Sequence, residues 1–201
     1  MRALFPAFLG LTLWLSLLVA PAAAHWQPKE GQDLIGTKAP EFAGLQWLNS
    51  APLTIAGLRG KAVFIRFWSM NCPYCAATAP TLNYLNQKYG RQGLVVIAIH
   101  HPKGEGEELR AAKNVEHTAN LYGFKFPVAL DNDWQTLNRY WTSKSRAFTS
   151  ASFLIDRQGR IAWVHDGGTF ALPKRYGGDE PDSAAFDSLA VALGTALAPS
   201  K

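Results

Sequence analysis

Residues 62–75 of this chain read AVFIRFWSMNCPYC, and this stretch decides the fold. Ala62 to Trp68 are almost all apolar, which is typical of a strand buried on both faces of a sheet. Pro73 directly follows Cys72, and proline favours the first position of a helix, where its missing N–H has no partner in any case. The stretch therefore predicts a buried strand that leads into a helix beginning at a cysteine.

Cys72 and Cys75 are the only two cysteines among the 201 residues. A disulfide between positions i and i+3 closes so short a loop that it restrains almost nothing of the unfolded chain. A structural role is therefore a poor explanation for the pair. Two chemical roles remain, namely a dithiol that opens and closes or half of a soft-metal site.

The predicted position of the pair favours redox chemistry. Free N–H groups and the positive end of the dipole at a helix N-terminus stabilise a thiolate, and the pKa of a thiol, about 8.5 when free, falls there to between about 3.5 and 7.5. We expect Cys72 to face outward as the nucleophile. Cys75 lies one turn further on the same face, from which it can resolve a mixed disulfide.

The first residues have the pattern of an export signal. Arg2 precedes an apolar stretch, residues 3–20, and small residues follow up to Ala24, so residues 1–24 are interpreted as a secretory signal peptide cut before His25. An uncleaved membrane anchor is the alternative, because about 20 apolar residues span a bilayer. Residues 25–35 are then a loose lead-in, and residues 36–201 form one domain. The net charge of +5 is spread without a basic cluster, so nucleic-acid binding is not indicated.

The other predicted elements follow from patterns of hydrophobicity and turn residues. Residues 94–99 are a second strongly apolar run and predict a buried strand parallel to the first. Arg157-Gln158-Gly159 separates two apolar runs and predicts a hairpin. The remaining predictions are short strands at 46–48, 53–55 and 127–130, and helices from 72 to 90 or 93 with a kink at Pro80, at 105–122, at 134–140 and at 183–197. Together they predict an α/β domain with helices on both faces of a central sheet.

These motifs resemble those of the thioredoxin-like superfamily. Phe67-Trp68 before the cysteines, C-P-Y-C itself and Pro80 five residues later carry the likeness, and six further runs make it similar to the TlpA/ResA/DipZ type: residues 36–42, 58–61, 88–90, 93–97, 126–133 and 153–161. The resemblance covers Gly36 to His165. It implies a thioredoxin fold, with a central mixed sheet, helices on both faces, TlpA-type N-terminal strands and a central insert.

The same resemblance implies a function. It is that of a monomeric thiol–disulfide oxidoreductase in the periplasm or elsewhere outside the cytoplasm, a reductase rather than an oxidase. It implies no organic cofactor. Its partners would be disulfide- or thiol-bearing proteins and an electron donor such as a membrane thiol reductase. Pro73 and Tyr74 between the cysteines, and Trp68 before them, are expected to shape the rim of the site.

Two positions depart from the family pattern. Ser150 stands where most relatives have a cis-proline, so we expect a trans Thr149–Ser150 bond and an altered substrate-binding loop. Arg66 stands where many thioredoxins have a buried aspartate. Arginine cannot act as a base, but it can favour a thiolate if its head reaches the site. We expect it instead to reach solvent or to pair with an acid.

Three further candidates remain. Glu105, in the insert, could be the proton acceptor that Arg66 cannot be, although such an acid more often belongs to a solvated helix start. His100 and His101 end the second apolar strand, at the sheet edge where the cysteines lie. Either could complete a copper site of the Sco type with the cysteines, and His165 is a later candidate. The favoured interpretation makes His100 and His101 surface residues at the strand end.

A peroxidase of the peroxiredoxin kind is disfavoured. Ser69 could fill one of the positions that such a site requires upstream of the reactive cysteine. Ile65, however, occupies the position where a proline is needed.

Overall fold

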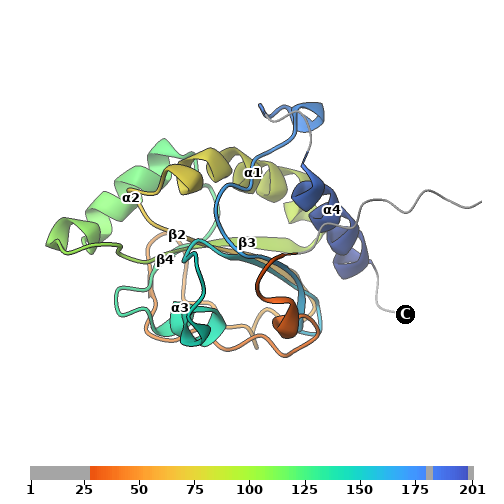
Figure 1. Ribbon diagram of the computed structural model, residues 1–201, viewed down its shortest axis with the longest axis horizontal. Helices are drawn as coiled ribbons and strands as arrows, with labels where there is room; N and C mark the ends of the chain where they lie inside the picture. The colour runs from red at the N-terminus through yellow and green to blue at the C-terminus, as the bar shows by residue number, and fades with distance from the viewer. Residues whose placement is uncertain (1–27, 180–182, 199–201) are drawn as a thin grey trace, which may run out of the picture.

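A central mixed sheet organises the computed structural model, which describes residues 28–179 and 183–198 (Figure 1). The strand order is β1-β4-β3-β2-β5-β6. β2 pairs in parallel with β3, and β3 with β4, whereas the other three neighbouring pairs are antiparallel. The strands are β1 (Gln46–Trp47), β2 (Ala62–Trp68), β3 (Leu94–His100), β4 (Val128–Leu130), β5 (Ser152–Ile155) and β6 (Ile161–His165). The predicted signal peptide lies outside the described residues.

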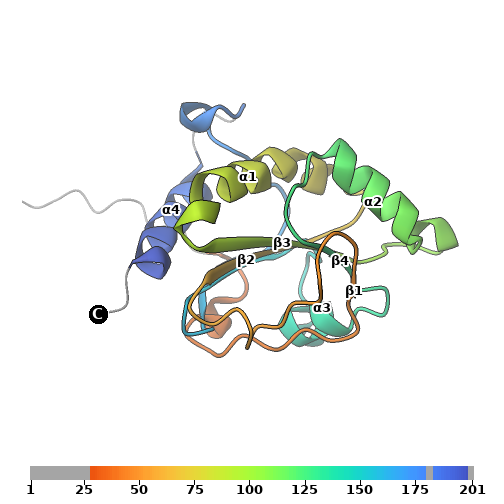
Figure 2. The ribbon, with the colours of Figure 1, turned by 180° about the vertical axis from the view of Figure 1, so that it is seen from behind.

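Helices cover both faces of this sheet, as the sequence predicts. α1, α2 and α4 lie on one face and α3 on the other, which Figures 1 and 2 show from opposite sides. Their bounds are α1 (Pro73–Tyr89), α2 (Ala112–Leu121), α3 (Gln135–Tyr140) and α4 (Ala184–Leu197). Short 3-10 helices occur at η1 (Gln32–Leu34), η2 (Gly90–Gln92), η3 (Glu107–Leu109), η4 (Thr142–Lys144) and η5 (Lys174–Tyr176).

The alternation of side chains along β2 divides the core into two layers. Phe64 and Trp68 belong to the layer under α1, α2 and α4, whereas Val63, Ile65 and Phe67 belong to the layer over α3. All seven residues of β2 are buried, which explains why the strand is almost continuously apolar.

α1 begins where the sequence predicts. Cys72 is the N-cap residue in an extended conformation, and Pro73 occupies the first helical position. The buried face of the helix is formed by Cys75, Ala79, Leu82 and Leu85, which follow helical spacing and pack onto β2 and β3. Burial of this face fixes the helix, and with it the position of both cysteines at the end of β2.

Two predicted elements differ from the structure. No strand forms at 53–55, because the N–H groups of Ile55 and Ala56 donate to the carboxylate of Glu41 at 2.9 and 2.7 Å instead of to a strand. The helix predicted at 105–122 is shorter, since Gly106 is extended (φ 165°) and α2 begins only at Ala112. The predicted hairpin and the parallel pairing of β2 with β3 are confirmed.

The described part of the lead-in, residues 28–35, is attached to the domain, so the prediction of a loose segment is wrong there. Gly31 adopts a left-handed conformation (φ 89°), and a Cβ at this position would lie 2.7 Å from the ring of Trp141. Only glycine fits such a close approach. Over the described ranges, no helix is long and apolar enough to cross a membrane.

Replacement of a leucine under α1 tests the role of this packing. Leu85 is fully buried, so Leu85→Ala should lower the free energy of unfolding by about 2–5 kcal/mol through lost burial and a cavity. Leu121, at the end of α2, is 72% exposed, and Leu121→Ala should change it by about 0.5 kcal/mol or less. Urea unfolding measures both, and equal effects would contradict the packing described here.

Candidate active site

The cysteine pair lies at the N-terminus of α1 as a disulfide, with the two Cα atoms 5.2 Å apart. Cys72 is half-buried and Cys75 is buried, with 3% of its surface exposed. The N–H of Cys75 donates both to the carbonyl of Cys72 at 3.0 Å and to its Sγ at 3.2 Å, so an amide of the first helical turn contacts the outer sulfur. The outer position of Cys72 and the inner position of Cys75 agree with the roles expected of them.

A cavity of about 160 Å³ opens beside the two cysteines. Its walls come from the end of β2, the first turn of α1, the segment after β3 and the loop before β5. The lining residues are Ser69, Cys72, Tyr74, Cys75, His101, Lys103, Ala147, Phe148, Thr149 and Ser150. Residues 144–150 are called the wall loop below, since four of them form one side of the cavity.

The wall loop contains the position where relatives carry a cis-proline. No described peptide bond is cis, so Thr149–Ser150 is trans as expected. Thr149 is fixed by its Oγ1, which lies 2.9 Å from Nε2 of His101. Ser150 is buried, and its Oγ accepts a hydrogen bond from the N–H of Gly168 at 3.2 Å. Polar contacts rather than a proline ring therefore hold this part of the loop.

Arg66 is buried, with 1% of its surface exposed, and the prediction that it reaches solvent or an acid is wrong. Its guanidinium donates to Oγ of Ser152 at 3.1 Å, to Oγ1 of Thr78 at 3.4 Å and to the carbonyl of Gly168 at 2.8 Å. Burial lowers the pKa of Arg66 to about 9, so it stays charged at neutral pH. Neutral hydrogen-bond acceptors thus stabilise it in place of a carboxylate.

Arg66 also contributes to the wall of the cavity through its neighbours. Gly168 accepts from Arg66 through its carbonyl and donates to Ser150 through its N–H. Thr78, which Arg66 contacts on α1, lies one turn after Cys75. The guanidinium therefore links the helix of the cysteines to the loop that faces them.

His100 and His101 are both buried, so the prediction that they are surface residues is wrong. The ring of His100 packs edge-on against that of Trp68, with their centroids 5.1 Å apart, and neither of its nitrogens has a hydrogen-bond partner among the described residues. Burial lowers the pKa of His100 to about 4. The pKa of His101 is lowered to about 3, mainly by burial and then by the charges of His100, Lys103 and Arg66.

Trp68 and Glu105 lie outside the lining of the cavity. Trp68 is 1% exposed and packs under α1 rather than at the rim, because its position in β2 turns it into the core. Glu105 is exposed on the segment after β3. Tyr74 does lie at the rim, whereas Pro73 is exposed on the first turn without lining the cavity.

The histidines do not form a metal centre with the cysteines. No group of three or more His, Cys, Asp or Glu residues that could hold a metal ion occurs in residues 28–179 and 183–198. His165 lies on β6 opposite Ser152, where burial, followed by the charge of Arg66, lowers its pKa to about 3. The copper-chaperone alternative thus has no support from this arrangement.

Comparison with known proteins identifies the family of this chain. The family model described as AhpC/TSA family matches residues 35–164, a range that contains the sheet up to Val164, α1 and the wall loop. This chain belongs to the AhpC/TSA family.

Two relatives illustrate the likeness within the AhpC/TSA family. The chain is 30% identical over 157 residues to the thiol-disulfide oxidoreductase ResA of Geobacillus thermodenitrificans (strain NG80-2), covering 78% of this chain and 83% of ResA. It is 34% identical over 133 residues to Protein DipZ of Mycobacterium bovis (strain ATCC BAA-935 / AF2122/97), covering 64% of this chain but 18% of DipZ. The match thus spans under a fifth of DipZ. The resemblance predicted from the sequence is confirmed.

Solved structures show the same fold. A thiol-disulfide isomerase from Corynebacterium glutamicum superposes with a TM-score of 0.59 at 25% identity, covering 81% of this chain and 98% of the other. A thiol:disulfide interchange protein of the thioredoxin family from Chlorobium tepidum TLS gives 0.58 at 22% identity, with 81% and 97% covered. The predicted thioredoxin fold is confirmed.

Three residues that line the cavity beside Cys72 and Cys75 were not singled out from the sequence. Lys103, Ala147 and Phe148 line it, and the ring of Phe148 lies edge-on to that of Tyr74 with their centroids 6.3 Å apart. Phe148 is 44% exposed and Tyr74 48%, so two accessible aromatic rings border the cysteines. The signal for Phe148 was its place two residues before Ser150, in the loop that the family resemblance marks as substrate-binding.

Burial of neutral His100 predicts a loss of stability in acid. The unfolded chain binds a proton at this histidine below its ordinary pKa of 6.5, whereas the folded protein binds it only near pH 4. Stability is therefore fully present above pH 6.5 and falls toward pH 4, and His100 contributes a loss of about 2 kcal/mol between pH 7 and pH 5. His100→Phe should remove that part of the slope in urea unfolding.

A matched replacement controls this measurement. His117 is exposed on α2, so His117→Gln should leave the difference in stability between pH 7 and pH 5 unchanged. The assignment to His100 is refuted when His100→Phe keeps the full acid slope of the unmodified protein.

Proposed function

We propose that this protein is a thiol–disulfide oxidoreductase that exchanges the Cys72/Cys75 dithiol for disulfides of partner proteins. One observation carries the proposal: an accessible sulfur at a helix N-terminus forms a disulfide with a buried sulfur one turn further on, beside an open cavity. The relatives named ResA support it. We assign the reductive direction because the family resemblance favours it.

Each turnover of the proposed reaction has two displacement steps. The thiolate of Cys72 attacks one sulfur of the partner's disulfide, which breaks that bond and releases the other sulfur as a thiolate that takes up a proton. The thiolate of Cys75 then attacks Sγ of Cys72 and releases the partner's second thiol. The partner gains two electrons, and Cys72 and Cys75 end as the disulfide seen here.

The surroundings of the cysteines suit this exchange. The amides at the start of α1 favour the thiolate over the thiol, because the dipole and the free N–H groups stabilise negative charge. Tyr74, Thr149 and Ser150 border the space that a partner's disulfide would enter. Arg66 adds a buried positive charge behind that wall and acts through Gly168 and Thr78.

The cellular setting is part of the proposal. The signal-like residues 1–24 and the family resemblance support an extracytoplasmic monomer, with residues 36–201 as its thioredoxin-like domain. There the oxidised pair would be reduced again by an electron donor such as a membrane thiol reductase. No organic cofactor is needed, since both electrons pass through the sulfur atoms.

Replacement of each cysteine tests the assignment of roles. Cys72→Ser should lower dithiothreitol-dependent reduction of insulin to the rate without protein, because the attacking sulfur is lost. Cys75→Ser should keep the first attack but accumulate a mixed disulfide with insulin, visible on a non-reducing gel. The roles would be reversed if Cys72→Ser trapped the partner and Cys75→Ser did not.

Two further measurements distinguish disulfide exchange from a metal-dependent function and from peroxidase activity. His101→Ala leaves both sulfurs in place but removes the contact that fixes Thr149, so insulin reduction should be weakened and not abolished, whereas a function that requires a metal on His101 would be lost. Consumption of hydrogen peroxide faster than reduction of insulin disulfides would refute disulfide exchange as the main activity.

A further inference from the structure

The wall loop lies in neither a helix nor a strand over most of its length. η4 ends at Lys144 and β5 begins only at Ser152. Ser145 adopts a left-handed conformation (φ 53°, ψ 48°), which residues with a side chain seldom take. Such a conformation persists only where the surroundings hold it. Contacts from elsewhere in the chain must therefore fix the wall loop.

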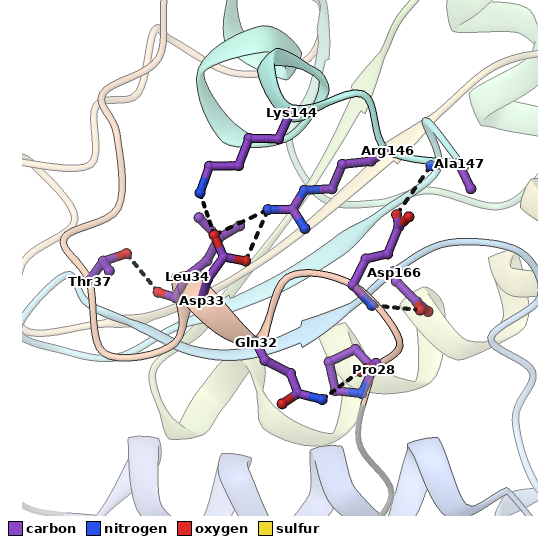
Figure 3. Close-up of polar contacts among 10 residues, drawn as sticks. Pro28, Gln32, Asp33, Leu34, Thr37, Lys144, Arg146, Ala147 and Asp166 are labelled. Atoms are coloured by element: carbon purple, nitrogen blue, oxygen red, sulfur yellow. Dashed lines mark hydrogen bonds and ion pairs between the residues drawn. The ribbon is translucent and has the colours of Figure 1, made fainter.

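The lead-in supplies these contacts, as Figure 3 shows. Asp33 accepts hydrogen bonds from Nζ of Lys144 at 2.5 Å and from the guanidinium of Arg146 at 3.1 Å. These two cations flank the left-handed Ser145. Glu30 accepts a hydrogen bond from the N–H of Ala147 at 3.1 Å. Two carboxylates of the lead-in thus hold three residues of the wall loop, Lys144, Arg146 and Ala147.

The lead-in is itself fixed to the end of the edge strand β6. Oδ2 of Asp166, just after β6, accepts hydrogen bonds from the N–H groups of Lys29 and Glu30 at 2.8 and 3.3 Å. Gly31 packs against the ring of Trp141. The lead-in therefore connects two anchored regions of the domain to the wall loop.

Trp141 transmits this support to the part of the wall loop that faces the cysteines. The guanidinium of Arg146 stacks 4.5 Å from the centre of the Trp141 ring. The indole N–H of Trp141 donates to the carbonyl of Phe148 at 2.5 Å. The side chain of Arg146 is 9% exposed and that of Asp33 is 46% exposed, so Arg146 is fixed against Trp141 while its ion pair with Asp33 stays partly open to solvent.

We propose that Glu30 and Asp33 are positioning residues that hold the wall loop in the shape that admits a partner protein to the Cys72/Cys75 site. The inference rests on the proposed function. The contacts of the lead-in hold the first part of the wall loop, residues 144–147, whereas His101 and Gly168 hold Thr149 and Ser150. Glu30 and Asp33 act on docking of a protein chain and not on the sulfur chemistry, because neither residue lines the cavity.

Single-turnover kinetics with two oxidants test this inference. Reduced Glu30→Ala/Asp33→Ala protein is mixed with insulin or with oxidised glutathione. The half-saturating concentration of insulin should rise about three- to tenfold, the factor expected when two ion pairs and one hydrogen bond that hold the wall loop are lost, with little change in the limiting rate. The second-order rate with oxidised glutathione should change less than about twofold, since so small a disulfide needs no wall loop.

Matched variants separate positioning from general damage. Asp187→Ala removes another aspartate–arginine pair, with Arg175, far from the wall loop in sequence, and should leave both reactions unchanged. Glu30→Gln is made alone, with Asp33 unchanged. The glutamine keeps an oxygen that can accept the hydrogen bond from the N–H of Ala147, so the half-saturating concentration of insulin should stay near that of the unmodified protein. If circular dichroism shows that the double variant does not fold, the same kinetics are measured with Asp33→Ala alone. The half-saturating concentration of insulin should then rise about threefold.

Each outcome decides one of the two proposals. A loss confined to insulin supports the positioning role. Equal effects on both oxidants, or no effect on either, overturn it while the oxidoreductase function stands. Failure of the unmodified protein to react with either oxidant refutes the proposed function itself.

Discussion

The position of the first turn of α1 at the end of β2 is the constraint on which the site depends. β2 is buried on both faces and cannot shift, and α1 is held against it by Cys75, Ala79, Leu82 and Leu85. Because a helix is rigid, burial of this face also fixes the N-cap at Cys72 and places the N–H of Cys75, in the first turn, against its sulfur. Core packing thus determines where thiol chemistry can occur.

The side of the cavity opposite the cysteines is built differently. It consists of irregular backbone held by buried polar groups and by the lead-in rather than by sheet hydrogen bonds. Arg66 satisfies the carbonyl of Gly168, which in turn supports Ser150, and Thr149 contacts His101. Burial of so many polar groups costs free energy, which their mutual hydrogen bonds largely offset. A specific wall therefore forms with Ser150, and not a proline, at this position.

Prediction from the sequence succeeded where local pattern and burial agree. The long apolar strands, the start of α1 and the hairpin after Ser152 were expected, since each has a periodicity or a turn signal within a few residues. Prediction failed for Arg66, His100 and His101, which are polar residues that the sequence placed near water or an acid. Their burial depends on Thr78, Gly168 and Trp68, which lie up to about a hundred positions away.

The sequence by itself determined the chemistry: two sulfurs at i and i+3, a proline that begins a helix after the first, and a strand that delivers them. These are local properties, because spacing and backbone preference act over one helical turn. Only the tertiary structure decided what surrounds the sulfurs. The wall loop, the buried guanidinium and the anchored lead-in come from segments far apart in the chain, and they meet because the sheet order β4-β3-β2-β5-β6 brings their ends to one site.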